Sequence, residues 1–394
     1  MIQLSFDVAR ARRDTPACER VIHFNNAGAS LIPQAILDAV INYQRLEAEI
    51  GAYEAEERER ERIEHVYDAA AALLGCQRDE IAFVENATRA WDMAFYSIPF
   101  KPGDRILTAK TEYASNYISY LQVARRTGAI VEVVPSDESG QLSVEALRKM
   151  MDERVKLIGM THVPTNGGLV NPAVEVGKVA RAAGVLYLLD ACQSAGQIPL
   201  NVDEIGCDFL SATGRKYLRG PRATGFLYVR RSRLEELEPP FLDLHAAAWT
   251  APDKYEVRRD ARRFENWETN FAGKLGLGMA IDYAVEWGIE AIWKRVYSLA
   301  ALLRSELQEL PGVQVRDLGT VRCGIVTFTV EGKDPEDVRR ALYGHGINVW
   351  QSVAPYALLD MTSRGIAKLV RSSVHYYNTE DEVHRFCRAL ACLA

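Results

Sequence analysis

Cysteine pairs and long apolar runs are missing from this sequence. The chain of 394 residues holds seven cysteines, an odd number, and they are scattered with no Cys-x-x-Cys pair. This pattern excludes a disulfide framework and a zinc site of the usual spacing. No stretch approaches the roughly 20 apolar residues that a membrane-spanning helix needs, and the N-terminus has no apolar core of a secretory signal. We therefore expect a cytoplasmic protein with no membrane contact and no metal site.

An excess of basic residues is also missing. The formal net charge is −6 and the isoelectric point is near 5.8, which argues against nucleic acid as a partner. No G-x-G-x-x-G sequence follows the first predicted strand, so a nicotinamide-binding enzyme is not favoured. The hydrophobic content of 48% is that of an ordinary globular protein, and the length predicts more than one domain.

From Ile81 onward, short apolar runs alternate with helical patterns. The runs predicted as strands are "IAFVEN", "DRILTAK", "AIVEVVP", "VKLIGMTHV", "VLYLLDA", "CDFLSAT" and "GFLYVR". Alternation of apolar strands with helices predicts a mainly parallel sheet with both faces covered. The preceding segment, residues 44–74, mixes both charge signs and ends in an alanine-rich run, which predicts one or two helices.

The rhythm breaks at residues 237–268, where prolines and charges predict an irregular segment that crosses the surface. Helical and strand-like patterns follow and form a separate α+β module. The sequence therefore predicts an α/β fold with an N-terminal arm (1–20), a large domain with a seven-stranded sheet (21–255) and a smaller C-terminal α+β domain (256–394).

Polar residues follow several of the apolar runs directly. Asp190 follows "VLYLL", Lys216 comes shortly after "DFLSA", Tyr113 follows "RILTAK", and Asn86–Thr88 follow "IAFVE". In a parallel sheet the carboxyl ends of the strands meet at one edge, where ligands bind. Each residue alone has a structural explanation, such as helix capping or exposure to solvent.

Together these residue types fit the needs of one cofactor, pyridoxal 5′-phosphate (PLP). PLP requires a lysine for a Schiff base, a carboxylate at its pyridinium nitrogen and a cradle for its phosphate. Asp190 would keep the ring nitrogen protonated, since opposite charges stabilise each other. Arg215 and Thr213, with a helix beginning near Thr88, would neutralise the phosphate.

Six segments in order carry a resemblance to a known family. They are "FNNAGAS" (24–30), "ENATRAW" (85–91), "DACQSAG" (190–196), "TGRKYLRGPRATGFLYV" (213–229), "RFENWETN" (263–270) and "RSSVHYYNTEDEV" (371–383). Over nearly its full length the chain resembles the class V aminotransferases, the fold-type I PLP enzymes that include cysteine desulfurases and isopenicillin N epimerase-like proteins. The resemblance implies PLP as cofactor, an amino-acid substrate and a homodimer.

The resemblance also implies a role for individual residues. Lys216 would form the Schiff base and Asp190 would face the ring nitrogen. The other implied contacts are Gln193 and Thr165 to the 3′ oxygen, Tyr113 stacked on the ring, Ala87, Thr88, Thr213 and Arg215 to the phosphate, and Arg371 and Asn26 to the substrate, with Arg371 on its α-carboxylate. Arg215 and Tyr113 stand where desulfurases have histidines.

The reaction is expected to differ from that of the desulfurases. Those enzymes carry a sulfur-accepting cysteine in a mobile loop of the C-terminal part, and no cysteine occurs here between Cys323 and Cys387. Cys192, beside Asp190, is interpreted as a buried inert thiol. Three segments look most like hercynylcysteine sulfoxide lyases, so we expect a C–S lyase that eliminates sulfur from a cysteine S-conjugate or sulfoxide. An aminotransferase or an epimerase is the alternative, and a PLP-fold protein that only binds is not favoured.

Overall fold

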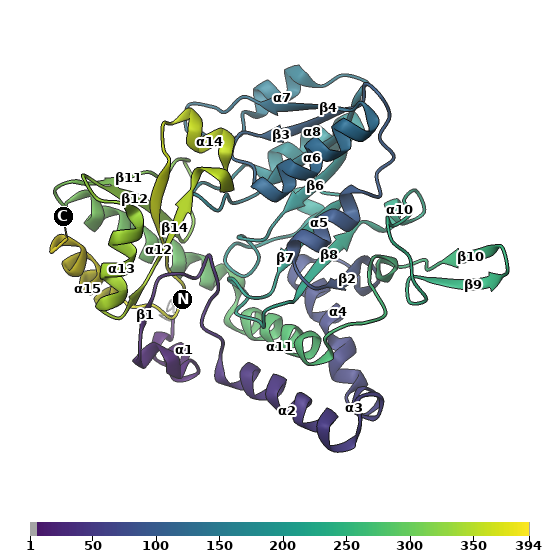
Figure 1. Ribbon diagram of the computed structural model, residues 1–394, viewed down its shortest axis with the longest axis horizontal. Helices are drawn as coiled ribbons and strands as arrows, with labels where there is room; N and C mark the ends of the chain where they lie inside the picture. The colour runs from purple at the N-terminus through teal and green to yellow at the C-terminus, as the bar shows by residue number, and fades with distance from the viewer. Residues whose placement is uncertain (1–5, 394) are drawn as a thin grey trace, which may run out of the picture.

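A seven-stranded sheet forms the centre of the computed structural model, which describes residues 6–393 (Figure 1). The strand order is β2-β8-β7-β6-β5-β3-β4, and only β8 runs antiparallel to its neighbours. The strands are β2 (Ile81–Val84), β3 (Arg105–Ala109), β4 (Ile130–Val134), β5 (Val155–Thr161), β6 (Leu186–Asp190), β7 (Phe209–Thr213) and β8 (Gly225–Val229). The predicted α/β fold with a mainly parallel seven-stranded sheet is confirmed.

Both faces of this sheet are buried, which explains its apolar strands. Along β6, Leu186 and Leu188 pack into one hydrophobic cluster while Tyr187 and Leu189 pack into another, because successive side chains point to opposite faces. The first cluster is completed by α5 (Ala87–Phe95) and α6 (Ala114–Thr127). The second is completed by α4 (Arg60–Leu74), α7 (Val144–Met150) and α8 (Ala173–Ala183).

Three helices stand where one or two were predicted before the sheet. They are α2 (Gln34–Ile50), α3 (Ala52–Arg58) and α4. Gly51, with a φ of 101°, separates the first two, and this left-handed region favours glycine. The long helix α11 (Phe271–Trp287) packs against α2 and α4 (Figure 1).

A second, four-stranded antiparallel sheet lies in the C-terminal part, in the order β11-β12-β15-β14. Its elements, with the helices around them, are α12 (Ile289–Gln308), β11 (Val313–Val315), β12 (Ile325–Val330), α13 (Pro335–Gly344), β14 (Trp350–Val353), α14 (Leu358–Ser363), β15 (Lys368–Ser373) and α15 (Glu380–Ala391). The N-terminal strand β1 (Ile22–His23) pairs with β13 (Ile347–Asn348), so the N-terminal segment joins the C-terminal part there. The two domain boundaries proposed from the sequence stay a prediction.

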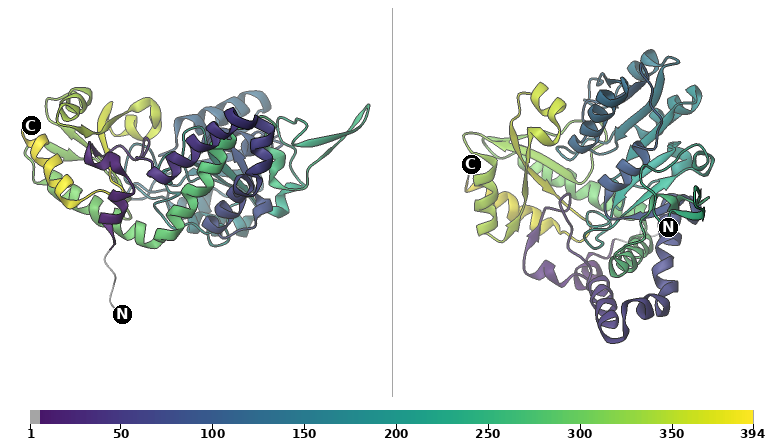
Figure 2. Two further views of the ribbon diagram at one scale, coloured as in Figure 1. Left: turned by 90° about the horizontal axis from the view of Figure 1, so that it is seen from below. Right: turned by 45° about the vertical axis from the view of Figure 1, so that its right-hand side comes forward.

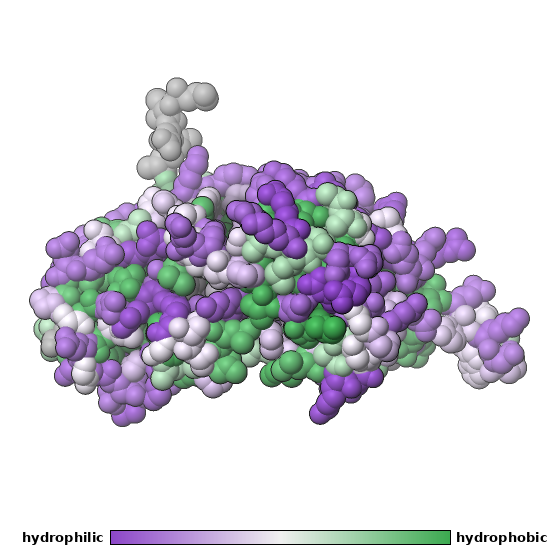
Figure 3. Space-filling model, turned by 90° about the horizontal axis from the view of Figure 1, so that it is seen from above, coloured by the Kyte–Doolittle hydropathy of each residue, from purple (hydrophilic) through white to green (hydrophobic). Residues whose placement is uncertain are grey.

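A projecting hairpin replaces part of the irregular segment predicted at 237–268. It consists of β9 (Ala247–Ala251) and β10 (Lys254–Val257) and extends away from the body (Figures 1 and 2). Trp249 is 81% exposed and Tyr255 is 53% exposed on this hairpin, which Figure 3 shows at one end of the molecule. The alternation "AAWTAPDKYEV" around a turn is a strand signal that the prolines and charges obscured.

The remaining elements are short. They are α1 (Val8–Arg13), η1 (Pro16–Glu19), η2 (Arg78–Glu80), α9 (Val202–Ile205), α10 (Arg231–Leu234), η3 (Ala261–Phe264) and η4 (Ala354–Tyr356). None of the helices in residues 6–393 is long and apolar enough to cross a bilayer.

Candidate active site

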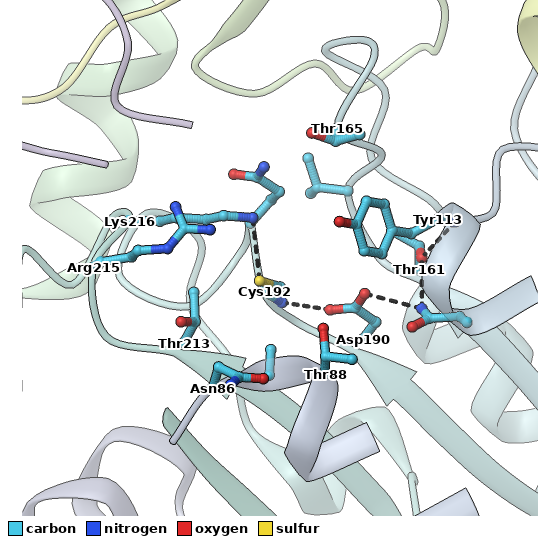
Figure 4. A pocket seen from close by; sticks show the side chains of 14 residues that line it. Asn86, Thr88, Tyr113, Thr161, Thr165, Asp190, Cys192, Thr213, Arg215 and Lys216 are labelled. Atoms are coloured by element: carbon cyan, nitrogen blue, oxygen red, sulfur yellow. Dashed lines mark hydrogen bonds between the residues drawn. The ribbon is translucent and has the colours of Figure 1, made fainter. Parts of the chain in front are cut away.

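A cavity of about 430 Å³ lies at the carboxyl edge of the central sheet (Figure 4). Nine of the residues proposed from the sequence line it: Ala87, Thr88, Tyr113, Thr165, Asp190, Gln193, Thr213, Arg215 and Lys216. They come from the ends of several strands and from the first turn of α5, as expected for the edge where parallel strands end. Sequence reasoning did not assign Asn86, Asn116, Thr161, Val163 and Cys192 to this lining.

Lys216 lies in the turn that follows β7. Its Nζ donates to Sγ of Cys192 at 3.2 Å, and this thiol lines the cavity, which the sequence did not predict. The turn is held by Arg219, whose φ of 61° lies in the left-handed region. The buried Arg219 guanidinium donates to Leu31 O at 2.9 Å and to Tyr376 Oη at 2.7 Å, which anchors the turn to the rest of the chain.

Asp190 ends β6 and presents its carboxylate to the cavity (Figure 4). Its Oδ1 accepts from Cys192 N at 2.8 Å and its Oδ2 accepts from Asn116 Nδ2 at 3.0 Å. Burial raises the pKa of Asp190, while these hydrogen bonds and the nearby Lys216 amine act in the opposite direction. A cationic N–H placed against this carboxylate would relieve the burial cost.

The start of α5 forms one wall of the cavity. Asn86 caps the helix by accepting from Arg89 N at 2.9 Å, so the N–H groups of the first turn point toward the cavity end of the helix. The helix can approach the sheet closely because Gly225 has no side chain. A Cβ at Gly225 would lie 2.6 Å from Ala212 O and 3.0 Å from Asn86 C.

Thr213 and Arg215 complete this end of the cavity (Figure 4). The helix N-terminus, two threonine hydroxyls including that of Thr88, and one guanidinium are the groups that bind a phosphate in proteins. The donors at this end of the cavity therefore match a phosphate dianion.

Arg371 on β15 lies behind Thr165 and is 6% exposed. Its Nη1 donates to Thr165 Oγ1 at 2.7 Å and to Thr165 O at 3.2 Å, and its Nη2 lies 3.5 Å from Asn25 Oδ1. Within residues 6–393 no carboxylate lies within 4.0 Å of this guanidinium, and its buried Nε lacks a hydrogen-bond partner. Burial lowers the pKa of Arg371 to about 10, and the charge of Arg215 adds to the effect.

Asn26 is not brought to the cavity. It is fully buried, its Nδ2 donates to Ser373 O at 2.7 Å and to His23 O at 3.1 Å, and its Oδ1 accepts from Tyr377 Oη. Both ends of the amide are therefore used inside the protein, and the neighbouring Asn25 is the residue near Arg371.

Gln193 has one amide atom without a partner. Its Nε2 donates to Ala27 O at 3.1 Å, while the buried Oε1 has no hydrogen-bond partner among residues 6–393. An unpartnered polar atom at the cavity lining indicates a site built for a polar ligand. Tyr113 points across the same space (Figure 4).

Two of the missed residues could have been predicted from the sequence. Thr161 is the last residue of β5 and pairs in register with Asp190. Asn116 lies three positions after Tyr113 in α6, on the same face of the helix. The sequence signal was present for both but was not used.

The family profile described as "Aminotransferase class-V" matches residues 22–386. A probable cysteine desulfurase of Xylella fastidiosa is 32% identical over 397 residues, covering 98% of this chain and 95% of the relative. A probable cysteine desulfurase of Methanothermobacter thermautotrophicus is 29% identical and covers 94% of each chain. The solved apo structure of a cysteine desulfurase from Thermococcus onnurineus is 28% identical, with a TM-score of 0.92 over 100% of this chain and 99% of that one.

These comparisons contradict the expected reaction. The sequence interpretation favoured a C–S lyase and disfavoured a cysteine desulfurase because of the missing loop cysteine. The relatives that match nearly the whole chain are named cysteine desulfurases. The absence of one residue from one loop was given too much weight against similarity over the full length.

Proposed function

The chain belongs to the class V aminotransferase family, and on this premise we propose that it is a PLP-dependent enzyme that acts on L-cysteine as a cysteine desulfurase. The observation that carries the proposal is the cavity, in which Lys216, Asp190 and a phosphate-type donor set meet around a thiol. Full-length similarity to cysteine desulfurases supports the choice of substrate.

The residues present fit PLP. Lys216 supplies the amine, Asp190 the carboxylate for the ring nitrogen, and the first turn of α5 with Thr213 and Arg215 the phosphate donors. The cofactor, when bound, supplies an aldehyde for the amine and an electron sink for the charge that develops at the substrate Cα. Gln193 Oε1, which lacks a hydrogen-bond partner, offers one more polar atom to the cofactor in the same lining.

The chain's own residues divide the remaining work. Arg371 binds the substrate α-carboxylate as a bidentate fork and so fixes which atoms of the substrate face Lys216. Lys216, once its amine is free, takes the proton from Cα. Asp190 would accept the ring N–H of the cofactor, and the positive charge there would offset the burial that raises the pKa of its carboxyl. Tyr113 lines the same cavity and would stack on the cofactor ring.

Cys192 is the proposed sulfur acceptor. It is the cysteine that lines the cavity within residues 6–393, whereas Cys323 and Cys387 are buried elsewhere. Burial raises the pKa of the Cys192 thiol, while the positive charge of Lys216, 3.2 Å away, acts in the opposite direction, and the thiol proton is the one that the substrate Cβ takes up. The sulfur of Cys192 then bonds to the substrate sulfur, the substrate Cβ–S bond breaks, and Cβ takes a proton. L-cysteine and the enzyme thiol become L-alanine and an enzyme persulfide.

Transfer of the amino group is the second candidate. Two observations favour it: residues 324–386 contain no cysteine, and burial opposes ionisation of the Cys192 thiol. Transamination uses the same deprotonation at Cα by Lys216 and needs no thiol. It predicts a keto acid that forms only with an amino acceptor.

One experiment separates the two candidates. The PLP-loaded enzyme is incubated with L-cysteine and a thiol reductant, and alanine and sulfide are measured. Desulfuration predicts equal amounts of both, lost in Cys192→Ala and kept in Cys392→Ser, which changes an exposed cysteine. Alanine and sulfide at the wild-type rate from Cys192→Ala would exclude Cys192 as acceptor. No alanine from the wild type, with keto acid formed from an added acceptor, would favour transamination.

The proposal includes a homodimer, as the family resemblance implies. The projecting hairpin supports it, because Trp249 and Tyr255 present large apolar side chains to solvent there. Light scattering of the purified protein is expected to give twice the chain mass, and deletion of residues 248–256 is expected to give the mass of one chain.

A further inference from the structure

Glu112 is a buried acid next to the candidate active site that the proposed function does not use. It lies between β3 and α6, is 3% exposed and does not line the cavity. Within residues 6–393 no lysine, arginine or histidine forms an ion pair with it. Burial of a carboxylate without a cation costs folding free energy, so its hydrogen-bond partners indicate its role.

Donors from three elements converge on this carboxylate. Its Oε1 accepts from Tyr113 N at 2.8 Å, from Asn116 Nδ2 at 3.0 Å and from Thr161 Oγ1. Its Oε2 accepts from Thr108 Oγ1 at 2.8 Å and, more weakly, from Thr161 N at 3.3 Å. Tyr113, Asn116 and Thr161 all line the cavity. Glu112 therefore holds three lining residues in place from behind.

The link to Asp190 passes through one amide. Asn116 Nδ2 lies 3.0 Å from Glu112 Oε1 and 3.0 Å from Asp190 Oδ2. Only the NH₂ end of an amide can serve two carboxylates, since it carries two hydrogens. In the flipped amide, Asn116 Oδ1 would face the carboxylate oxygens of Glu112 and Asp190, and a carboxylate would need a proton to bond with it. The charge of Glu112 thus excludes this orientation.

We propose that Glu112 is a positioning residue that orients the amide of Asn116 and thereby keeps the carboxylate of Asp190 free to accept the ring N–H of PLP. The inference rests on the proposed function, because it requires PLP in the cavity. Burial and the neighbouring Asp190 raise the pKa of Glu112, as expected for two acids that lie close together inside the protein. The other titratable groups around the pair are Tyr120, Tyr113, Cys192, Arg215 and Lys216.

The test compares Glu112→Gln with a matched buried acid at the opposite edge of the sheet. Asp208 precedes β7, is 6% exposed, and accepts from Tyr187 N at 2.9 Å and from Arg233 Nε at 2.9 Å. A glutamine at 112 offers an NH₂ group to Asn116 Oδ1 and so permits the flipped amide. Loss of one hydrogen bond to a charged group predicts PLP binding weaker by roughly tenfold.

Two readouts go beyond activity. The first is the affinity of cofactor-free protein for PLP, measured by visible absorbance. The second is nitrogen-15 NMR of enzyme loaded with PLP labelled at the ring nitrogen. Glu112→Gln is expected to bind PLP more weakly and to lose protonation of the ring nitrogen. Asp208→Asn is expected to unfold at lower denaturant concentration with wild-type values for both readouts.

The route through Asn116 is tested by a double-mutant cycle. If Glu112 acts through this amide, Glu112→Gln adds nothing to the loss of affinity caused by Asn116→Ala, because the two changes break one chain of contacts. Additive losses would overturn the proposal, as would a wild-type ring nitrogen signal in Glu112→Gln. If Glu112→Gln does not fold, the same measurements are made on Thr108→Val, which removes one donor to Glu112 outside the cavity. A smaller loss of PLP affinity is then expected. A wild-type protein that binds no PLP would instead reject the proposed function.

Discussion

Replacement of Arg371 by methionine should stabilise the cofactor-free protein and weaken substrate binding. Arg371 is 6% exposed and, among residues 6–393, has no carboxylate within 4.0 Å. A buried cation without an anion costs folding free energy, which is recovered only when a carboxylate binds. A long apolar side chain of similar length removes this cost.

The magnitude follows from the pKa. Burial lowers the pKa of Arg371 from its ordinary value to about 10. The charged form is therefore disfavoured in the folded state, which corresponds to about 3 kcal/mol of lost stability at neutral pH. The two hydrogen bonds to Thr165 return about 1 kcal/mol each. Arg371→Met is thus expected to gain about 1 kcal/mol, whereas an ordinary buried substitution loses stability.

The assay has two parts. Denaturant unfolding of the cofactor-free proteins is measured at neutral pH and above pH 10. The wild-type penalty begins to fall once the pH passes the lowered pKa of Arg371, so the advantage of the variant should shrink there. In the loaded enzymes, KM for L-cysteine should rise at least about 100-fold, since two charge-assisted hydrogen bonds are lost. PLP affinity should stay close to wild type. A variant that is about 2 kcal/mol less stable and keeps the wild-type KM would refute the reasoning.

Three further predictions concern the cofactor seat and the C-terminal part. Gly225→Ala should weaken PLP binding by about tenfold, because the new Cβ pushes the start of α5 away from the phosphate donors. Binding of pyridoxal, which has no phosphate, should stay nearly unchanged. Gly344→Ala is the control, because no heavy atom lies within 4 Å of its added Cβ. Asp190→Asn should lower kcat on the order of 100-fold while the protein stays folded, as judged by circular dichroism, and unchanged kcat would contradict its role. Asp317→Asn should cost about 3–5 kcal/mol in denaturant unfolding, because it leaves Arg304, 2.7 Å away, buried without its partner.

The cavity could be located from the sequence because its residues follow a topological rule. Asp190 and Lys216 come after apolar strands, and strands of this composition pair in parallel with their carboxyl ends together. Neither conclusion requires knowledge of side-chain packing. The same rule would have found Thr161, the last residue of β5.

The parts that the sequence did not reveal depend on packing. Asn26 has the residue type of a ligand-binding group, but Tyr377 and Ser373, some 350 positions later, use both ends of its amide. Glu112 shows no pattern in sequence, since its role arises from donors on β3, β5 and α6. Cys192 was interpreted from its neighbours in a strand-end motif, whereas its position against Lys216 depends on the turn after β7. The prediction of the reaction depended on a cysteine missing from one loop, and similarity over the whole chain favours a different reaction.

The most direct test of the account is to identify the amine that bonds to the cofactor. The protein is loaded with PLP and reduced with borohydride, and peptides are analysed by mass spectrometry. We predict a pyridoxyl group on Lys216 alone. Lys274 is the internal control, because it is also buried, at 5% exposed, but donates to Tyr67 Oη at 2.7 Å in a cluster outside the cavity. Modification of Lys274 in place of Lys216, or of neither, would contradict the account.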